Sequence, residues 1–399
     1  MIAVIADDLT GAAELGGIGL RYGLTVEIST RVGLSTAAEL LVIAADTRSM
    51  QEEEAVAEME RITRKLSLLQ PEWIYKKTDS VLRGHVVPEL KAQLKVLGLE
   101  RAVLIPANPA LGRTILNGHY FLNGLPVNQT AFSEDPEFAV TSSDLQDMLH
   151  SREAPVQIRK VGEALPERGI VVGEAQQNGD LEGWAALTGK RTLAAGASGF
   201  FSAILGRMKF PVTEVVRPAK PGAHPYGCPA LFVSGSTFDR SRETIRKIKA
   251  AGGPVSYMPA VTGSLEGEEE GPYREWCEEI LTFLAGKGKA IIAIEEGAAI
   301  VLEGDVPGDP TRSARLLRTH MAKLVRRVLQ EASIKELVIE GGATAYAILE
   351  LAGLRTFFPV EELAQGVVRM QAGEAPSLFV TVKPGSYDWP ESIRQLLEE

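Results

Sequence analysis

Two neighbouring acids, Asp7 and Asp8, follow a short apolar run near the start of the chain, and Thr10 and Gly11 come directly after them. Acids at a strand-to-helix junction either cap the helix, because Asp is a favoured N-cap residue, or hold a ligand. Successive side chains of a strand point to opposite faces, so both acids cannot aim at one spot if the strand continues through them. We expect Asp8 to face a ligand and Asp7 to support it, although spacing alone does not fix this order.

Three further polar segments in the first half of the chain follow apolar runs: "ADTRS" (45–49), "KKTDSVLRG" (76–84) and "PANPALGRT" (106–114). In open α/β sheets, ligands bind outside the carboxyl ends of the strands. A mixture of acids and cations there suits a small polyhydroxylated anion, because Arg or Lys binds a carboxylate and Asp accepts from hydroxyls. Helix capping is the alternative for any one segment, but four on one sheet edge favour a site. The candidate substrate-binding residues are Asp7, Arg48, Lys76, Lys77, Arg83, Asn108 and Arg113, with Asp8 and Asp79 as candidate catalytic residues.

Three glycine-containing segments stand out in the second half: "VSGS" (233–236), "IEGGATA" (339–345) and "VKPGS" (382–386). Glycine lets the backbone approach a phosphate closely, and the N–H groups and dipole of a helix N-terminus favour anions. Tight packing is the alternative for each segment, and also for the small-residue turn "AAGASGFF" (194–201). No P-loop pattern is present, so a nucleotide would be held by a less common arrangement. The candidate nucleotide-binding residues are Ser234, Ser236, Gly341, Gly342, Ala343, Thr344, Lys383 and Gly385.

The segments around these residues alternate between short apolar runs and longer stretches of helical period, which predicts parallel sheets covered by helices. Strands are expected at 1–6, 40–44, 73–76 and 102–105, and helices at 11–22, 51–69 and 87–97. The pattern fades from 108 to about 143, which indicates a functional loop or a small hairpin. The predicted fold is α/β, with two three-layer α/β/α domains and mainly parallel sheets.

The Pro- and Gly-rich stretch at 216–229 is the best domain boundary. It predicts an N-terminal domain at 1–215, a linker at 216–229 and a C-terminal domain at 230–399. At 399 residues the chain is long enough for two cores of this size.

Charge and cysteine content narrow the class of protein. The 42 Lys and Arg against 52 Asp and Glu give a net charge of −10, which argues against nucleic acid or an anionic membrane as the main partner. The two cysteines lie outside any metal-ligand spacing, so we expect no resident metal site and no disulfide framework. We see no signal peptide and no apolar run near the ~20 residues of a membrane span. The sequence thus predicts a cytoplasmic protein, and it leaves open whether the protein is a homodimer.

Several of these segments together resemble one family, the four-carbon acid sugar kinases of threonate, erythronate and 3-oxo-tetronate type. The matching stretches include "IADDLTGA" (5–12), "DTRS" (46–49), "YKKTDSVLRG" (75–84), "IPANPALGRTILNGHYFLNG" (105–124), "VSGS" (233–236), "GGATA" (341–345) and "VTVKPGSY" (380–387). They run in the family's order over nearly the whole chain. The chain departs from the family at Ala343, where an acid is usual, and in "GASGFF" (196–201) and "KPGSY" (383–387), so it resembles a divergent member.

The resemblance implies that the N-terminal domain at 1–215 is a sugar-acid-binding domain and that the C-terminal domain at 230–399 is a nucleotide-binding domain for ATP. It also implies that phosphoryl transfer takes place in an active-site cleft between the two domains. By motif, Asp8, Arg48, Lys77, Asp79 and Arg83 would hold the sugar acid, and Ser236, Gly341, Gly342, Thr344, Lys383 and Gly385 would line the ATP site. Our hypothesis is that Arg83 and Lys77 meet the substrate carboxylate, that Asp8 or Asp79 orients or deprotonates the reacting hydroxyl, and that Mg²⁺ bridges the phosphates of ATP.

Two rival functions stay open. One is a two-domain protein that binds a small molecule and a nucleotide without turnover. The other is a sugar phosphatase with an aspartyl nucleophile, which "DDLTG" (7–11) resembles superficially. Here the acids are adjacent rather than two apart, so both would not face one phosphate from a strand. ATP consumption would separate a kinase from both rivals.

Overall fold

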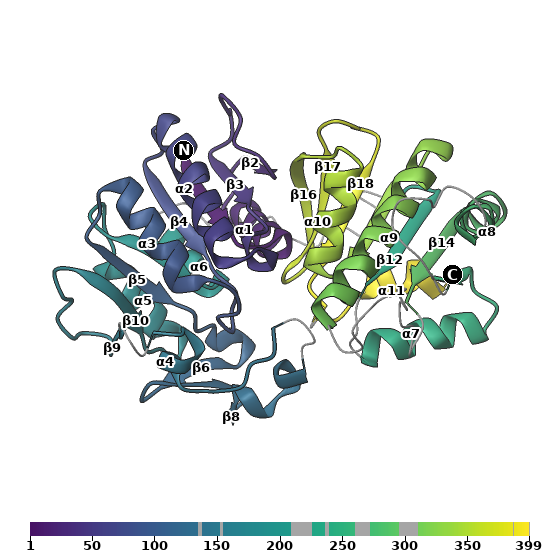
Figure 1. The fold of residues 1–399 in the computed structure, drawn as a ribbon. Helices are drawn as coiled ribbons and strands as arrows, with labels where there is room; N and C mark the ends of the chain where they lie inside the picture. Colours follow the sequence, from purple (N-terminus) through teal and green to yellow (C-terminus); the bar gives the residue numbers. More distant parts are fainter. Residues whose placement is uncertain are drawn as a thin grey trace. The chain divides into compact units, whose positions relative to one another are not determined.

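The computed structural model describes residues 1–134, 138–151, 155–208, 226–235, 239–259, 272–294, 310–385 and 387–398. The chain divides into two compact units, an N-terminal unit Met1–Val215 and a C-terminal unit Val216–Glu399 (Figure 1). Most of the predicted linker at 216–229 lies outside the described residues. Each unit is built from a mainly parallel sheet with helices, so the prediction of a two-domain α/β protein is confirmed.

The N-terminal unit is built on a sheet in which neighbouring strands are parallel. In order across the sheet they are β2 (Val26–Ser29), β3 (Leu40–Ala44), β1 (Ile2–Ala6), β4 (Trp73–Lys77), β11 (Leu193–Gly196), β5 (Arg101–Ile105), β10 (Gly169–Gly173) and β9 (Gln157–Arg159). The chain leaves β1 toward β2 and β3 on one side and later returns to β4 on the other. The strand order therefore reverses between β1 and β4, which is where ligands bind in open α/β sheets.

Helices cover both faces of this sheet, which is why β1 and β3 are apolar and buried along their whole length. Helix α2 (Glu52–Leu68) packs against α3 (Val86–Leu97), while α1 (Leu9–Arg21) and α5 (Asn178–Leu187) pack against α6 (Ser198–Arg207). Two consecutive lysines of β4 show which face each group of helices covers. Lys76 contacts α3 of the first group, and Lys77 contacts α1 of the second. Because strand side chains alternate, the two groups lie on opposite faces of the sheet.

The irregular stretch after β5 contains a small antiparallel sheet of β6 (Arg113–Leu116), β7 (His119–Leu122) and β8 (Leu125–Pro126). The hairpin alternative of the sequence analysis is therefore the one that the chain adopts. Asn117-Gly118 and Asn123-Gly124 form its two turns, and all four residues have positive φ. Asn-Gly is the favoured pair for such two-residue turns. A short helix, α4 (Leu145–Met148), follows.

The C-terminal unit has the strand order β13 (Val255–Tyr257), β14 (Lys289–Ala293), β12 (Ala230–Ser234), β15 (Glu336–Glu340), β18 (Phe379–Lys383), β17 (Val367–Ala372) and β16 (Thr356–Ala364). From β13 to β18 the strands are parallel, and the hairpin of β16 and β17 joins antiparallel to β18. The sequence analysis did not predict this hairpin. The strand order reverses between β12 and β15, so the carboxyl ends of these two strands flank a second switch point.

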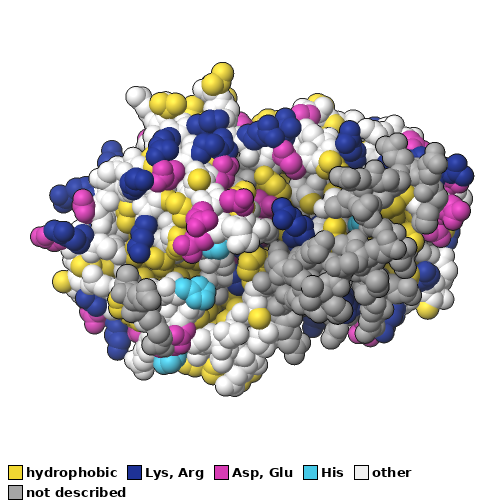
Figure 2. Space-filling model, in the orientation of Figure 1, with side chains coloured by type: hydrophobic (Ala, Val, Ile, Leu, Met, Phe, Trp, Pro, Cys, Tyr) yellow, Lys and Arg dark blue, Asp and Glu magenta, His cyan; other side chains and the backbone are white. Residues whose placement is uncertain are grey.

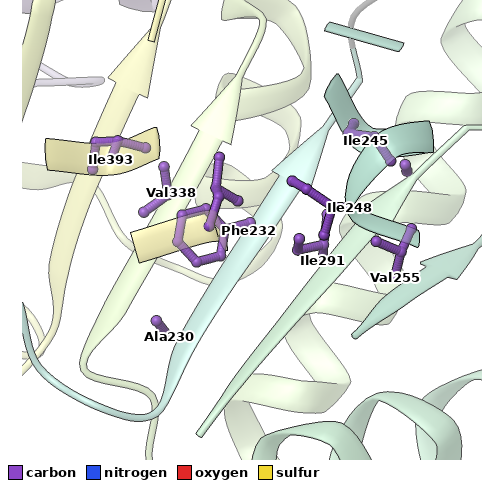
Figure 3. Packing of buried hydrophobic residues seen from close by; sticks show 10 residues of the cluster. Ala230, Phe232, Ile245, Ile248, Val255, Ile291, Val338 and Ile393 are labelled. Atoms are coloured by element: carbon purple, nitrogen blue, oxygen red, sulfur yellow. The ribbon is translucent and has the colours of Figure 1, made fainter. Parts of the chain in front are cut away.

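The core of the C-terminal unit shows why the C-terminal helix forms (Figure 3). Phe232 of β12, Ile291 of β14 and Val338 of β15 pack with Ile248 of α7 (Asp239–Ala250) and Ile393 of α11 (Glu391–Glu398). Helix α9 (Pro310–Glu331) packs against α8 (Pro272–Lys287) and α10 (Gly342–Leu351). The sequence analysis missed α11, which is short and gains its stability from this packing rather than from propensity.

No helix within the described ranges is long and apolar enough to cross a membrane. Both cysteines are free thiols, with Cys228 exposed and Cys277 buried. On the face seen in Figure 2, Lys and Arg side chains alternate with Asp and Glu side chains. The net charge of −10 is therefore not gathered into one acidic field on this face.

Candidate functional site

The carboxyl ends of β1 and β4 bring together three of the predicted acids. Ala6 of β1 lies opposite Lys77 of β4, so Asp7 and Asp8 leave one strand beside Asp79, which leaves the other. All three acids are buried. Arg48, which follows β3, and Arg83 complete a group that we call the Asp–Arg cluster: Asp7, Asp8, Arg48, Asp79 and Arg83.

Arg48 holds the cluster together. Its Nε and Nη2 donate to Asp7 Oδ2 at 3.0 and 2.8 Å, its Nη1 lies 3.2 Å from Asp8 Oδ2, and its Nη2 lies 3.5 Å from Asp79 Oδ1. Burial lowers the pKa of Arg48, but the carboxylates of Asp7, Asp8 and Asp79 outweigh it and the pKa is raised well above its usual value. A side chain at Gly84, whose φ is +86°, would place Cβ 3.1 Å from Arg48 Cγ. The conformation and small size of Gly84 therefore make room for this arginine.

Asp8 caps helix α1. Its Oδ1 accepts from the Gly11 N–H at 2.7 Å, and its Oδ2 accepts from the Thr10 hydroxyl at 2.7 Å. Burial raises the pKa of Asp8, but Arg48, Lys77 and these hydrogen bonds outweigh it, so the net pKa is lowered. Capping and ligand binding were alternatives for this segment, and Asp8 serves as the cap.

Asp79 is held by Arg83 in a bidentate pair, with Nε donating to Oδ2 at 2.9 Å and Nη2 donating to Oδ1 at 2.8 Å. The N–H groups of Val81 and Arg83 also donate to Oδ2, at 3.1 and 3.2 Å. Burial raises the pKa of Asp79, but Arg83 and Arg48 outweigh it and the pKa lies well below its usual value. This carboxylate is thus a saturated acceptor that stays ionised at neutral pH.

Asp7 differs from its neighbour. Its Oδ2 accepts both hydrogen bonds from Arg48, while its Oδ1 is buried and has no hydrogen-bond partner among the described residues. A buried carboxylate oxygen without a donor is costly and rare in a folded protein. Of the three acids in the cluster, Asp7 therefore offers an acceptor to a ligand hydroxyl.

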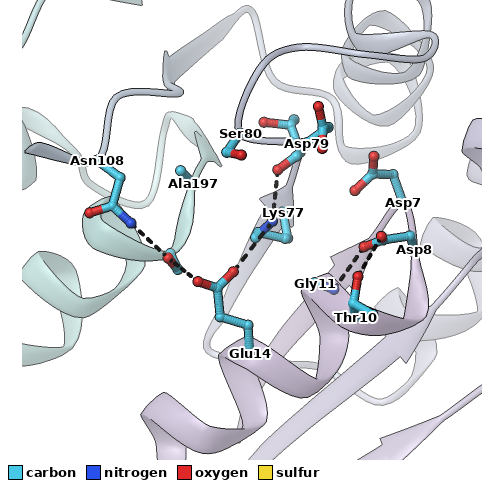
Figure 4. A network of polar contacts seen from close by, with 12 residues as sticks. Asp7, Asp8, Thr10, Gly11, Glu14, Lys77, Asp79, Ser80, Asn108 and Ala197 are labelled. Carbon is cyan, nitrogen blue, oxygen red and sulfur yellow. Dashed lines mark hydrogen bonds and ion pairs between the residues drawn. The ribbon is translucent and has the colours of Figure 1, made fainter. Parts of the chain in front are cut away.

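A chain of polar contacts leads from the cluster toward two other strand ends (Figure 4). The Lys77 ammonium donates to the Thr78 carbonyl at 2.9 Å and lies 3.8 Å from Glu14 Oε2 on α1. Ser198, at the start of α6, donates to Glu14 Oε1 at 2.7 Å and accepts from Asn108 Nδ2 at 3.1 Å. Asn108 follows β5 and is buried, so this predicted residue reaches the site through Ser198 and Glu14.

Two other predicted substrate-binding residues, Arg113 and Lys76, are not members of the Asp–Arg cluster. Arg113 lies beside Phe132, whose ring also faces Arg83, with guanidinium-to-ring distances of 5.9 and 5.4 Å. Lys76 points to the opposite face of β4, is fully buried, and pairs with Glu89 of α3 at 2.7 Å. The expectation that Lys76 lines the site therefore does not agree with its placement, because adjacent strand residues face opposite sides of the sheet.

In the C-terminal unit, the ends of β12, β15 and β18 meet through a second buried network. Glu340 accepts from Ser234 Oγ at 3.1 Å, from Lys383 Nζ at 2.8 Å, and from the Ser241 hydroxyl. Lys383 also donates to the carbonyls of Pro384 and Tyr387, at 3.0 and 2.6 Å. Its ammonium is fully buried, and burial lowers its pKa despite the opposing effect of Glu340. The expected contact of Lys383 with a nucleotide does not agree with this enclosure, since Lys383 shapes the turn after β18 instead.

The glycines of this unit bring the start of α10 against the end of β12. Gly341, at φ +99°, precedes the helix, and its N–H donates to the Lys383 carbonyl at 2.9 Å. A Cβ on Gly235 would lie 2.2 Å from Thr344 Oγ1, so only glycine fits there. No side chain of the described residues caps α10. The N–H groups of its first turn, from Gly342 through Ala343 to Thr344, are thus available to an anion. We call this segment, with Gly235 and Gly341, the α10 site.

Ser236 lies outside the described residues, and the carbonyl of Gly385 lies 3.5 Å from the Lys383 ammonium.

The sequence analysis missed Glu14 and Ser198. The only signals for them are an acid inside an otherwise apolar helix and the small-residue turn at 194–201. Over the described ranges, no three or more His, Cys, Asp or Glu side chains gather where they could hold a metal ion.

The fold and the two switch points define a two-domain α/β protein. One unit carries the Asp–Arg cluster, in which Asp7 Oδ1 has no hydrogen-bond partner among the described residues, and the other carries a helix start without a side-chain cap. Comparison with known families agrees with this class. A family model described as a sugar-binding N-terminal domain matches residues 2–204, and one described as a nucleotide-binding C-terminal domain matches residues 231–387. The chain therefore belongs to the family that joins these two domains.

Curated relatives match nearly the full length. A D-threonate kinase of Bordetella bronchiseptica is 25% identical over 97% of this chain and 94% of its own. A D-threonate kinase of Cupriavidus necator is 28% identical over 96% and 94%, and a 3-oxo-tetronate kinase of Methylobacterium radiotolerans is 23% identical over 100% and 98%.

Two solved structures share the fold at low sequence identity. One, from Salmonella typhimurium LT2, covers 99% of this chain and 98% of its own with a TM-score of 0.74 and 19% identity. The other, from Haemophilus influenzae, covers 100% of both chains with a TM-score of 0.65 and 19% identity. Both support the α/β architecture of the two units.

Replacing Asp79 by Asn is expected to lower the free energy of unfolding by about 3–5 kcal/mol near pH 7, because the partly exposed Arg48 and Arg83 both lose the buried carboxylate that they contact. The lowered pKa of Asp79 means that its contribution is present above its ordinary pKa of 3.8 and is lost as the pH falls through the lowered value. The difference between wild type and D79N should therefore shrink below about pH 4. Denaturant unfolding at a series of pH values measures it. The control D388N removes the acid of an exposed ion pair with Arg240 and should leave the free energy of unfolding almost unchanged.

Replacing Gly235 by Ala is expected to displace the start of α10, because the new Cβ would overlap Thr344 Oγ1. We expect ATP affinity to fall about tenfold or more, about 1.4 kcal/mol, and stability to fall by about 1–3 kcal/mol. Calorimetric titration with ATP measures the affinity. Gly286, in α8, has no atom within 4 Å of its would-be Cβ, so G286A should leave both unchanged or raise stability slightly. Equal ATP affinity in G235A and G286A would remove the α10 site from nucleotide binding.

Proposed function

We propose that this protein is an ATP-dependent kinase that phosphorylates a hydroxyl group of a four-carbon sugar acid. The observation that carries the proposal is that one chain combines the Asp–Arg cluster at the first switch point with the α10 site at the second. The names of the full-length relatives, which are kinases of D-threonate and 3-oxo-tetronate, support the substrate class. Phosphoryl transfer requires positioning and charge neutralisation rather than covalent chemistry by the protein, and both sites supply groups of that kind.

For the sugar acid, we propose Lys77 and Arg113 as the cations that meet the carboxylate. The hypothesis from the sequence used Arg83 with Lys77. However, Arg83 donates from Nε and Nη2 to Asp79, which leaves fewer of its N–H donors for a ligand. The ammonium of Lys77 has three donors, and one of them is taken by the Thr78 carbonyl. Arg83 would act mainly by holding Asp79 in place.

For the reacting hydroxyl, we propose Asp7 as the acceptor, in place of Asp8 or Asp79. Both oxygens of Asp8 and of Asp79 already accept hydrogen bonds, whereas Asp7 Oδ1 has no donor among the described residues. A hydroxyl donating to Asp7 Oδ1 would satisfy this buried oxygen and would be oriented by it. Arg48, bonded to the other oxygen, would keep the Asp7 carboxylate in place.

For the nucleotide, we propose that the N–H groups at the start of α10 bind phosphate oxygens of ATP. Mg²⁺ would enter with ATP, because it is usually held by phosphates, waters and one or two carboxylates rather than by a protein cage. Its role when bound is to neutralise charge on the phosphates. We also propose that the protein acts in the cytoplasm, where its two free thiols would stay reduced, and size-exclusion chromatography would decide whether it is a homodimer.

A panel of four-carbon sugar acids, assayed for ADP formation with ATP and Mg²⁺, tests the proposed function. We expect turnover with one of D-threonate, D-erythronate or 3-oxo-tetronate, and little ATP hydrolysis without an acid. ATP binding with no turnover on any acid would indicate a binding protein instead. Release of phosphate from a sugar phosphate without ATP would indicate a phosphatase.

Substituting Asp7 by Asn is expected to lower kcat by about 10²- to 10⁴-fold, because the acceptor for the reacting hydroxyl loses its charge. The KM for ATP should change little. Asp8→Asn is the matched comparison, since an asparagine can still accept from the Gly11 N–H and cap α1. D8N should therefore retain more kcat than D7N. The opposite order would return the reacting hydroxyl to Asp8.

A further inference from the structure

Glu14 and Ser198 lie behind the Asp–Arg cluster, and the catalytic scheme above does not use either residue. We propose that they are positioning residues, which fix the Lys77 ammonium where it meets the substrate carboxylate. The proposal rests on the proposed function, since it assigns a role within the same sugar-acid site. It also gives a function to the small-residue turn at 194–201, for which the sequence alone left packing as an equal alternative.

Glu14 is a buried carboxylate inside helix α1, where an unpaired charge would be strongly unfavourable. Its Oε1 accepts from the Ser198 hydroxyl at 2.7 Å, and its Oε2 lies 3.8 Å from the Lys77 ammonium. The first contact is a short hydrogen bond, whereas the second is too long for one. Ser198 therefore fixes the orientation of the Glu14 carboxylate, and Glu14 acts on Lys77 through charge.

The neighbouring lysine on the same strand shows what a purely structural pair looks like. Lys76 contacts Glu89 directly at 2.7 Å, and both side chains are buried on the opposite face of the sheet. The Lys77 ammonium, in contrast, is held away from Glu14 and toward the cluster. It packs beside Gly11, where a Cβ would lie 3.1 Å from Nζ, and it contributes to the lowered pKa of both Asp8 and Asp79.

The backbone around Ser198 is shaped to bring its hydroxyl to Glu14. Gly196 has φ +144°, and a Cβ there would lie 2.1 Å from the Ile105 carbonyl oxygen. A Cβ on Gly199 would lie 2.9 Å from Asn108 Oδ1. Both glycines are thus required for the close approach of this turn to β5, and Asn108 in turn donates to Ser198. The network thus links the carboxyl ends of β5 and β11 through Asn108, Ser198 and Glu14 to Lys77 at the end of β4.

Removing the Glu14 charge changes the balance of forces on Lys77. The ammonium lies 3.8 Å from Glu14 Oε2, and it also interacts electrostatically with the carboxylates of Asp8 and Asp79. Without Glu14, the attractions that remain are the hydrogen bond to the Thr78 carbonyl and the charge of the cluster acids. The ammonium would therefore shift toward the cluster and away from the position in which it meets the substrate carboxylate. The effect should fall on the sugar acid and not on ATP.

The test compares Glu14→Gln and Ser198→Ala with the matched control Glu89→Gln, which breaks the other buried Lys–Glu pair of β4. Thermal unfolding of each variant is recorded first. Calorimetric Kd values for the sugar acid and for ATP, and the KM and kcat values, are then measured. We expect E14Q to weaken sugar-acid binding about tenfold or more and S198A to weaken it severalfold, with the Kd for ATP unchanged in both. E89Q should lose stability but keep the wild-type Kd for the sugar acid.

A double-mutant cycle with Lys77→Met decides whether Glu14 acts through the lysine. If it does, E14Q has no further effect on sugar-acid affinity in the K77M protein. Additive effects of the two substitutions, or equal losses of affinity in E14Q and E89Q, would overturn the proposal, and S198A provides the same comparison if E14Q fails to fold. Absence of sugar-acid binding by the wild-type protein would instead overturn the proposed function and, with it, this assignment. A wild type that turns over while E14Q and S198A bind normally would overturn the assignment alone.

Discussion

The N-terminal site depends on the ion pairs of the largely enclosed Arg48 guanidinium. It contacts Asp7, Asp8 and Asp79, which leave two neighbouring strands, while Arg48 itself follows a third. Three carboxylates so close together would repel one another and would raise each other's pKa values if no cation lay between them. With Arg48 among them and Arg83 on the far side of Asp79, the pKa values of Asp8 and Asp79 are lowered instead. Ionised acids can thus be concentrated at one sheet edge.

Because of this constraint, helix capping and ligand binding do not exclude each other in the segment "IADDLTG" (5–11). The cap fixes the start of α1 and thereby the direction in which the strand ends. Once Asp8 is committed to Gly11 and Thr10, the adjacent Asp7 is turned toward Arg48 and keeps one oxygen free of donors among the described residues. Asp8 therefore caps the helix, and Asp7 supplies the carboxylate oxygen without a donor. The cap at Asp8 fixes the local backbone that places Asp7.

Sequence patterns predicted the parts of the fold that depend on local periodicity. The strand predicted at 40–44 is β3, and the helix predicted at 51–69 is α2 with one residue fewer at each end. The sequence showed that the strand ends are polar, but it did not show which face of the sheet each side chain points to. Lys76 and Lys77 look alike in "KKTDS", and only the pairing of β4 shows that they face opposite sides. The β16–β17 hairpin and α11 were missed because packing within the C-terminal unit, rather than a period, stabilises them.

The two strand-end lysines show how burial decides what a cation can do. Lys383 is enclosed by Glu340 and by the carbonyls of the turn that follows it, so its donors are spent within the protein. Lys77 has its acid at 3.8 Å and, among the residues that the structure describes, one short contact to a carbonyl, so it keeps capacity for a ligand. A phosphate at the second switch point would consequently meet N–H groups of α10 rather than an ammonium. Neutral backbone donors carry no net charge, and this favours a nucleotide whose phosphate charge is already reduced by a cation. The carboxylate of the proposed sugar-acid substrate would arrive without such a cation, and the N-terminal unit carries the fixed positive charge that could meet it.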